Sequence, residues 1–516
     1  MPGRPNVLWL MSDQHNANCA GYAGHPNVRT PSLDRIAGHG ITFTNAFANN
    51  PICAPSRICF TTGQYPHTHR LLGNDHSVYP HPNPNTLPCL FRRYGYQTAL
   101  IGKSHTVPLW DREGFEHIRY TDLCDASPED PTTSHYFKYL VDRGLADLYG
   151  EGVQKKGQEY VLDGSEPALL PFEHSVEHFT GEETLKFLDG RDADRPFFVH
   201  MSFERPHSPI APAPEHFNMY DPGDIVLPEN ASDYFENRFS GKPAFMQKLL
   251  RNGCPYPLAD PNPARLKRCL ASYYALITEM DIEIGRVLDS LAEAGELENT
   301  IVLYTADHGD FAGEHGLFHK NLGIYESIHR IPFVLTWPGG PQGRQCNAIV
   351  ESVDWYPTLC GLCNVPAPKD TEGIDLIPVT NGDRPVKDAA FCEWDWPIGR
   401  ISAIRTEDFR LVYYQGSAEG ELYDRRDDPG ETRNLWADAA YAGTRMALVE
   451  RLLGFTMQYR ADSDLAADRI LGEKLKHTPR YLVHFGRRYW SELKDAYERG
   501  SSWPPVDGRR GTRDPS

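Results

Sequence analysis

Short apolar runs that stop abruptly at polar residues recur along the N-terminal part of the chain. Four of them cover residues 7–11, 98–101, 197–201 and 301–304. Unbroken runs of this length are typical of strands that are buried on both faces, as in a parallel sheet. We therefore predict that the four runs form strands of one mostly parallel sheet.

A helical pattern precedes the last of these strands. Over residues 264–293, apolar side chains recur at every third or fourth position, and Gly295 follows as a helix terminator. The stripe is typical of a helix that packs against a sheet. Strands that alternate with such helices predict the α/β class, a doubly wound, mixed but mostly parallel sheet flanked by helices.

The remaining segments suggest how the chain is divided. Residues 110–170 and 208–263 are rich in Pro, Asn, Tyr and Asp without clean periodicity, so we expect insertions that cover the active site. Residues 409–414 and 421–423 resemble hairpin strands. We predict a catalytic domain over 1–365, a smaller α+β domain over 366–458, and a tail over 459–516 that contacts a neighbouring subunit in a homodimer or homotetramer.

Charge narrows the range of partners. The chain has 52 Lys and Arg against 70 Asp and Glu, a net charge of -18, and no long basic block. Nucleic acid and acidic membrane surfaces are therefore excluded as expected partners. An anionic substrate would need a site built locally from cations, backbone donors or a metal.

The N-terminal residues and the cysteines indicate the cellular compartment. Residues 1–6 lead directly into the first apolar run, which is too short for a signal peptide, and no stretch approaches a membrane span. The eleven cysteines form no even disulfide framework. We expect a cytoplasmic protein, and we interpret the Cys360-x-x-Cys363 pair as structural because no second ligand pair accompanies it.

Polar clusters follow the four predicted strands. Because the carboxyl ends of parallel strands meet at one edge of a sheet, these clusters are expected to converge in one crevice. Carboxylate and amide oxygens suit calcium or magnesium, and a histidine nitrogen also admits manganese. The chemically useful residues of these clusters are Asp13, Gln14, Lys103, His105, His207, Asp307 and His308.

Cys53 is a candidate nucleophile. It opens the segment Cys53-Ala54-Pro55-Ser56-Arg57, in which Pro55 suits a first helical turn and Gly63 suits the helix end. A helix N-terminus and Arg57 would stabilise a thiolate or a bound oxyanion. The alternative is that Cys53 is a small buried residue at a helix start.

This segment resembles the signature of the type I sulfatases, members of the alkaline phosphatase superfamily, in which the cysteine is converted to formylglycine. Further segments match the family in its order: Asp13 after the first strand, Gly102-Lys103-Ser104-His105, Asp307-His308-Gly309 and Gly313-Glu314-His315-Gly316. The resemblance implies an alkaline-phosphatase-like fold and a formylglycine-generating enzyme as a partner. It also implies one divalent metal, usually Ca²⁺, held by Asp13, Gln14, modified Cys53, Asp307 and His308. Many relatives have Asp and Asn where Gln14 and His308 stand, so Mn²⁺ and Mg²⁺ remain open.

The resemblance also implies catalytic roles. A hydrated formylglycine would attack sulfur or phosphorus, with His105 as the base for the second step. Lys103 and Lys320 would neutralise the oxyanions, and Arg57 would hold the nucleophile. His207 is the best candidate for the general acid, and Asn74 is a weaker candidate for a substrate contact.

We therefore predict a sulfatase, of the arylsulfatase kind, acting on small aryl or alkyl sulfates. The alternative is a phosphonate monoester or phosphodiester hydrolase with promiscuous sulfatase activity, which Gln14 and the C-terminal tail favour. A two-metal phosphatase with a Ser or Thr nucleophile lacks its further ligands here, and an inactive scaffold would not need Cys53 and Arg57. A cysteine phosphatase would need a glycine-rich loop after Cys53, which Pro55 and Ser56 do not supply.

Overall fold

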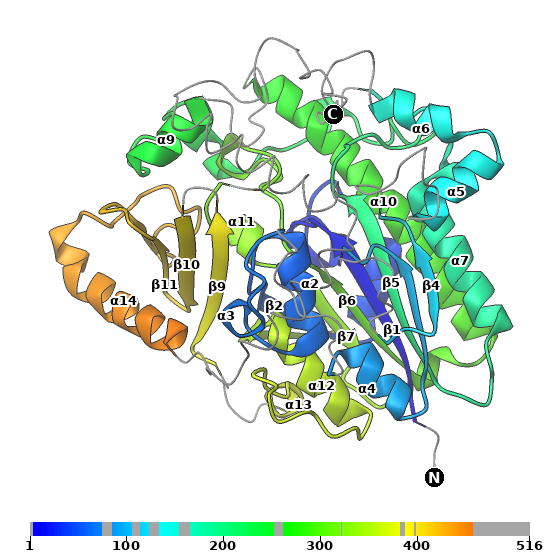
Figure 1. Ribbon diagram of the computed structural model, residues 1–516. Coiled ribbons are helices and arrows are strands. Elements are labelled where there is room, and N and C mark those ends of the chain that lie inside the picture. Colours follow the sequence, from blue (N-terminus) through cyan, green and yellow to red (C-terminus); the bar gives the residue numbers. More distant parts are fainter. Residues whose placement is uncertain are drawn as a thin grey trace, which may run out of the picture.

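The computed structural model describes residues 4–74, 85–105, 114–122, 134–153, 166–251, 262–320, 322–381, 387–396 and 399–457. Figure 1 shows a large sheet with helices on both faces and a second, smaller sheet beside it. The predicted 459–516 tail lies outside the described residues. Within them, no helix combines the length and the apolar character needed to cross a membrane.

The large sheet has eight strands in the order β4-β3-β5-β1-β6-β7-β2-β8. The four predicted runs are adjacent, mutually parallel strands at its centre, β3, β5, β1 and β6. Among the described strands of this sheet, only β7 runs antiparallel to both of its neighbours, β6 and β2. The predicted mixed, mostly parallel sheet is confirmed. Its strands are β1 (Asn6–Asp13), β2 (Ile41–Phe47), β3 (Gln97–Gly102), β4 (His117–Tyr120), β5 (Phe197–Pro206), β6 (Thr300–Ala306), β7 (Phe333–Thr336) and β8 (Arg344–Glu351).

Helices cover both faces because side chains alternate along each strand. From β1, Trp9 packs into a core that includes residues of α2, α4 and α12, whereas Leu8 and Leu10 pack into a core with residues of α1, α7 and α10. The predicted long helix is α10. The C-terminal half of its apolar stripe packs against the sheet, and the N-terminal half packs against residues 210–225 and 312–318. The helices on the first face are α2 (Cys53–Thr62), α4 (Leu87–Arg93) and α12 (Trp355–Leu362), and those on the second are α1 (Pro31–Gly38), α7 (Val176–Gly190) and α10 (Pro263–Glu293).

The smaller sheet is an antiparallel meander in the order β12-β11-β10-β9. The predicted hairpin strand over 409–414 is β11, and helix α14 packs on the sheet (Figure 1). This confirms a smaller α+β part, while the exact domain boundaries stay predictions. The elements are β9 (Ala389–Trp396), β10 (Gly399–Thr406), β11 (Phe409–Tyr414), β12 (Glu421–Asp424) and α14 (Ala442–Thr456).

The two expected insertions carry short elements that sequence periodicity did not reveal. Strand β4 joins the edge of the large sheet, and α5 buries Tyr136, Phe137 and Leu140. Helices of four to eight residues have too few turns to give a clear period. The remaining α-helices of the described residues are α3 (Pro66–His69), α5 (His135–Asp142), α6 (Ala146–Val153), α8 (Ser232–Phe235), α9 (Ala244–Arg251), α11 (Glu326–His329) and α13 (Ile377–Thr380).

Candidate functional site

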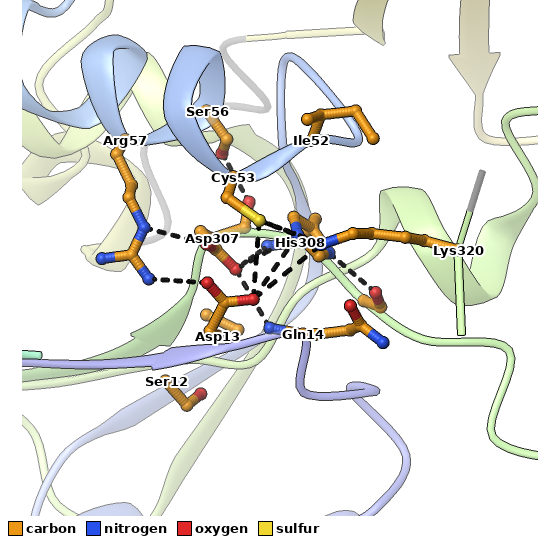
Figure 2. A network of polar contacts seen from close by, with 12 residues as sticks. Ser12, Asp13, Gln14, Ile52, Cys53, Ser56, Arg57, Asp307, His308 and Lys320 are labelled. Atoms are coloured by element: carbon orange, nitrogen blue, oxygen red, sulfur yellow. Dashed lines mark hydrogen bonds and ion pairs between the residues drawn. The ribbon is translucent and has the colours of Figure 1, made fainter. Parts of the chain in front are cut away.

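A buried group of metal-ligand atoms lies at the carboxyl ends of the central strands. Asp13 ends β1, Asp307 and His308 follow β6, and Cys53 begins α2 directly above them (Figure 2). One carboxylate oxygen from each aspartate, the Cys53 sulfur and a His308 nitrogen all lie within 4.8 Å of one another. The expected convergence of strand ends therefore occurs.

The loop after β6 is shaped around Asp307. Its Oδ1 accepts the backbone N–H of Gln14 at 3.0 Å and that of His308 at 2.9 Å. The next residue, Gly309, has no room for a side chain, since a Cβ there would lie 1.9 Å from the Ser327 carbonyl oxygen. The glycine thus lets the loop fold closely enough to present both Asp307 and His308 to the site.

Helix α2 begins at Cys53 itself, whereas the sequence prediction placed Cys53 just ahead of the helix. Asn74, the predicted substrate contact, lies at the start of this helix: its Oδ1 accepts the N–H of Ala54 at 3.2 Å. Ser56, one turn along, donates a hydrogen bond to the Asp307 carbonyl oxygen. These contacts fix the positive end of α2 over the carboxylates.

Arg57 binds the carboxylates of Asp13 and Asp307 through their Oδ2 atoms. Its Nε donates to Asp307 Oδ2 at 2.9 Å and its Nη2 to Asp13 Oδ2 at 3.2 Å. Its Nη1 donates to Ser202 Oγ at 2.7 Å and to the Lys103 carbonyl oxygen at 3.1 Å. Because the guanidinium takes both Oδ2 atoms, the two Oδ1 atoms are left on the side of Cys53 and His308.

The tautomer of His308 follows from its contacts. Its Nδ1 donates to the Gly309 carbonyl oxygen at 2.9 Å, so in the neutral ring the lone pair is on Nε2. Burial lowers the pKa of His308, but Asp307 and Cys53 raise it above its ordinary value, so a metal would compete with a proton for this nitrogen. That Nε2 lies 3.2 Å from Cys53 Sγ. The ammonium of Lys320 lies 2.9 Å from both atoms, so positive charge is favourable at this place.

The cluster perturbs its members in opposite directions. Burial raises the pKa of Asp13, but Lys103, His207, Lys320 and Arg57 together hold it well below its ordinary value. Burial and the Asp13 charge raise the pKa of Asp307. Burial and Asp13 would also raise the pKa of Cys53, but Lys320 and His308 lower it to about 6. A thiol that ionises near neutral pH is a reactive one.

Two predicted site residues, Lys103 and His105, follow the end of β3. Lys103 Nζ is 3.0 Å from Asp13 Oδ2 and 3.3 Å from Glu204 Oε2. The backbone N–H groups of Ser104 and His105 donate to the Asp122 carboxylate at 2.9 and 2.7 Å. Burial and the nearby charge of Lys103 lower the pKa of His105 well below its ordinary value.

His207 belongs to the same surroundings. Its Nδ1 donates to the Ser208 carbonyl oxygen at 2.8 Å, so Nε2 carries the lone pair. Burial and the charge of Lys320 lower its pKa well below the ordinary value, while Asp13 acts in the opposite direction. The imidazole is therefore close enough to the cluster to sense its charges.

Sequence reasoning did not select Asp310 and Glu204. Asp310 accepts the Gln14 amide Nε2 at 2.6 Å, and burial raises its pKa to about 7. Because the amide nitrogen is held there, Oε1 is the Gln14 atom suited to a metal. Burial likewise raises the pKa of Glu204, beside Lys103, to about 7. The closeness of Asp310 to Asp307 in sequence was a usable signal, whereas Glu204 resembles an ordinary strand-end carboxylate.

The donor set fits a divalent cation. Two carboxylates, the Gln14 amide oxygen and an imidazole nitrogen with an accepting Nε2 are oxygen and nitrogen donors of the kind that Ca²⁺, Mg²⁺ and Mn²⁺ take. The thiol of Cys53 stands in for whatever oxygen a modified side chain would present. Burial, and then the Asp13 charge, raise the pKa of Asp307, and a bound cation would oppose both effects.

Known proteins share this architecture. The family model described as Sulfatase matches residues 5–365, and that described as N-sulphoglucosamine sulphohydrolase, C-terminal, matches residues 313–458. An arylsulfatase of Clostridium perfringens is 31% identical, with 84% of this chain and 90% of the relative covered. An N-acetylglucosamine-6-O-sulfatase of Bacteroides thetaiotaomicron is 28% identical over 89% of this chain and 88% of its own. The crystal structure of a phosphonate monoester hydrolase of Agrobacterium radiobacter superimposes with a TM-score of 0.73 at 26% identity, covering 88% of this chain and 96% of that one.

Proposed function

Because this chain belongs to the sulfatase family of sulfuric ester hydrolases, we propose that it cleaves sulfate monoesters of small aryl or alkyl alcohols. The observation that carries the proposal is the position of Cys53. Its sulfur lies at the start of α2, within 4.8 Å of ligand atoms from Asp13, Asp307 and His308. A nucleophile at this place would be activated by the same cation that binds the ester oxygens.

The family generally uses a divalent metal and formylglycine, and the residues here suit both. We propose that Asp13, Gln14, Asp307, His308 and modified residue 53 hold one ion, with Ca²⁺ first and Mn²⁺ or Mg²⁺ as alternatives. The ion would supply positive charge to the sulfate oxygens and lower the pKa of the nucleophile. Arg57 keeps the two carboxylates oriented for this task by holding their outer oxygens.

The proposed nucleophile is residue 53 after a formylglycine-generating enzyme has oxidised its thiol. A hydrated aldehyde there would supply one hydroxyl to attack sulfur and a second whose deprotonation releases sulfate. Lys103 and Lys320 bind the sulfate oxygens from two sides. His105 accepts the proton of the second hydroxyl.

His207 is the proposed general acid. As the bond between sulfur and the bridging oxygen breaks, its electron pair stays on oxygen, which takes the proton from Nε2. In the free site burial and Lys320 keep the pKa of His207 low. A bound sulfate would bring negative charge against Lys103 and Lys320, which raises that pKa toward the range an acid needs.

A second candidate function is hydrolysis of phosphonate monoesters or phosphodiesters. Two observations favour it: the Gln14 amide, held by Asp310 in place of a third carboxylate, and the likeness to the Agrobacterium radiobacter hydrolase. Both substrates place a tetrahedral oxyanion in the same site. We therefore expect some activity on each ester, with sulfate preferred.

The test combines mass spectrometry of the peptide that contains residue 53 with parallel assays on an aryl sulfate and an aryl phosphonate monoester. We expect the mass loss of thiol-to-aldehyde conversion and a higher kcat/KM for the sulfate. A higher value for the phosphonate promotes the second function. Full activity with an unmodified Cys53 would overturn the formylglycine mechanism for both. The expected homo-oligomer is checked on the same sample by light scattering.

A further inference from the structure

Arg205 is a buried cation that the proposed reaction does not use directly. It lies near the end of β5, two residues before His207, and only 7% of its surface is exposed. We propose that Arg205 is a positioning residue, whose contacts with the backbone around His207 aim the imidazole at the bridging oxygen of the ester. The inference rests on the proposed function, in which His207 is the general acid.

The guanidinium binds the backbone on both sides of one peptide group. Its Nη1 donates to the His207 carbonyl oxygen at 2.9 Å and to the Pro209 carbonyl oxygen at 2.7 Å. The carbonyl between them, that of Ser208, accepts the His207 Nδ1 proton at 2.8 Å. Arg205 therefore holds the two neighbours of the group that orients the imidazole. With Nδ1 tied to this backbone, Nε2 is the atom left to serve the substrate.

These carbonyls are the close partners of Arg205. The carboxylate of Glu177, from α7, lies further away, with Oε1 3.6 Å from the Arg205 Nε. Burial raises the pKa of Glu177 to about 8, although Arg205 opposes the shift, so this carboxyl is largely protonated at neutral pH. A buried guanidinium needs acceptors, and here the backbone of residues 207 and 209 supplies them at hydrogen-bond distance.

The next part of the segment is anchored separately. Glu279, from α10, accepts the N–H of Ala213 at 2.8 Å and lies 3.0 Å from His216 Nδ1. Loss of Arg205 should therefore release residues 207–209 while Ala213 and His216 stay in place. The expected defect is a misaimed imidazole, and small misplacements of a catalytic group cost about 10- to 100-fold in rate.

The experiment uses leaving-group dependence, because a general acid matters more when the departing alkoxide is more basic. The variants are Arg205→Met, His207→Ala, the double variant and Glu177→Gln, each assayed with 4-nitrophenyl, phenyl and 4-methoxyphenyl sulfate. We expect Arg205→Met to lose about 10-fold or more in kcat on 4-methoxyphenyl sulfate beyond its loss on 4-nitrophenyl sulfate. Adding Arg205→Met to His207→Ala should cost nothing further, since both changes remove one function.

The controls separate the two levels of the argument. Glu177→Gln replaces a neighbouring carboxyl, largely uncharged at neutral pH, by an amide and leaves the backbone contacts, so any loss should be equal on all three esters. If Arg205→Met folds poorly, Arg205→Lys, with one ammonium in place of the fork, should show a weaker loss with the same leaving-group trend. A leaving-group effect in His207→Ala but not in either Arg205 variant overturns the positioning role. No leaving-group effect in His207→Ala overturns the general acid of the proposed function instead.

Discussion

Two of the buried charge clusters in the described part of the chain behave differently. The site cluster consists of Asp13, Cys53, Arg57, Asp307, His308 and Lys320. The interface cluster lies where α11 meets the smaller sheet and consists of Glu326, Arg405, Arg410, Arg425 and Glu431. Both combine carboxylates with guanidinium groups in the interior, so burial of charge alone does not mark a functional site.

In the interface cluster, cations surround each carboxylate. Arg410 pairs with Glu326 and, at 2.6 Å, with Glu431, while Arg405 lies 3.1 Å from Glu326. Burial would raise the pKa of Glu326, but Arg410, Arg425 and Arg405 hold it well below its ordinary value. The negative charge is compensated within the fold, and this cluster joins two parts of the chain.

In the site cluster, Arg57 pairs with both carboxylates, and Lys103 is a second close cation for Asp13 but not for Asp307. Arg57 takes the Oδ2 atoms of Asp13 and Asp307, so their Oδ1 atoms face Cys53 and His308 (Figure 2). Burial and Asp13 raise the pKa of Asp307, which is the reverse of the shift at Glu326. Asp13 is compensated like Glu326, so the two clusters differ in the direction of the Oδ1 atoms and in the weaker compensation of Asp307.

The largest effect is expected at Cys53. Cys53→Ala removes the proposed nucleophile without touching the carboxylate contacts of Arg57, so kcat should fall by about 10⁴-fold or more. Stability should change by only about 1 kcal/mol, the usual scale for a small buried deletion. Steady-state kinetics and urea unfolding give the two numbers.

A matched control is Cys269→Ala, which removes a buried thiol from α10 in the core that this helix forms with Ile210 and Tyr220. Its activity should stay within about twofold of the wild type, since surface and core changes away from a site act mainly on stability. Residual turnover by Cys53→Ala at more than about a hundredth of the wild-type rate would contradict the nucleophile assignment.

The next effect, on stability, belongs to the interface cluster. Arg410→Met leaves Glu326 and Glu431 buried with one fewer partner, and breaking such a pair costs about 3–5 kcal/mol. Turnover per folded molecule should be nearly unchanged, because the contact lies outside the site cluster. Arg400→Met is the matched control from the same sheet: its pair with Asp395 is exposed, so the cost should stay below about 1 kcal/mol. Equal losses of unfolding free energy in the two variants would show that burial of the ion pair does not determine its contribution to stability.

Features of the fold and the site could be predicted when they depend on residues close together in the sequence. The end of a strand is such a feature, so Asp13, Lys103 and Asp307 were predicted from the ends of apolar runs. The contact of Asn74 with the start of α2 was missed because its partner, the N–H of Ala54, is 20 residues away and belongs to backbone. Arg205 was missed because its acceptors are carbonyl groups, which leave no pattern in side chains.

The interface cluster could not be predicted from the sequence, for a related reason. Glu326 and Arg410 are 84 residues apart, and an isolated Glu or Arg normally indicates a solvated surface. Only the packing of α11 against β11 turns them into a buried pair. Fold class follows from periodicity, whereas compensation of charge depends on tertiary contacts that no local pattern encodes.

A smaller effect is expected when the site cluster loses one charge. Asp307→Asn keeps the shape of the side chain but removes negative charge from the ligand group, so affinity for a divalent ion should fall by about 100-fold. Metal content after dialysis against a weak chelator measures this independently of activity, as does the rise in Tm on adding Ca²⁺ or Mn²⁺. Glu326→Gln, the corresponding loss in the interface cluster, should leave metal content unchanged. Equal loss of metal in both variants would remove the distinction between the clusters.

The smallest effect is a difference in pH dependence. The pKa of Glu326 is lowered in the fold, so its contribution to stability is present above the ordinary pKa of a glutamate, about 4.3, and is lost as pH falls through the folded value. The gap in unfolding free energy between wild type and Glu326→Gln should therefore be constant at neutral pH and shrink below about pH 4, by at most about 1.4 kcal/mol for each step of one pH unit.

The pKa of Glu177 is shifted in the opposite direction, to about 8. The folded state therefore loses stability as pH rises from about 4.3 to 8, and the stability of Glu177→Gln should increase relative to the wild type over that window. Urea unfolding at a series of pH values in both windows gives the slope of each free-energy difference against pH. Slopes of the same sign would show that the number of cationic partners does not set the pKa values of these two carboxyl groups.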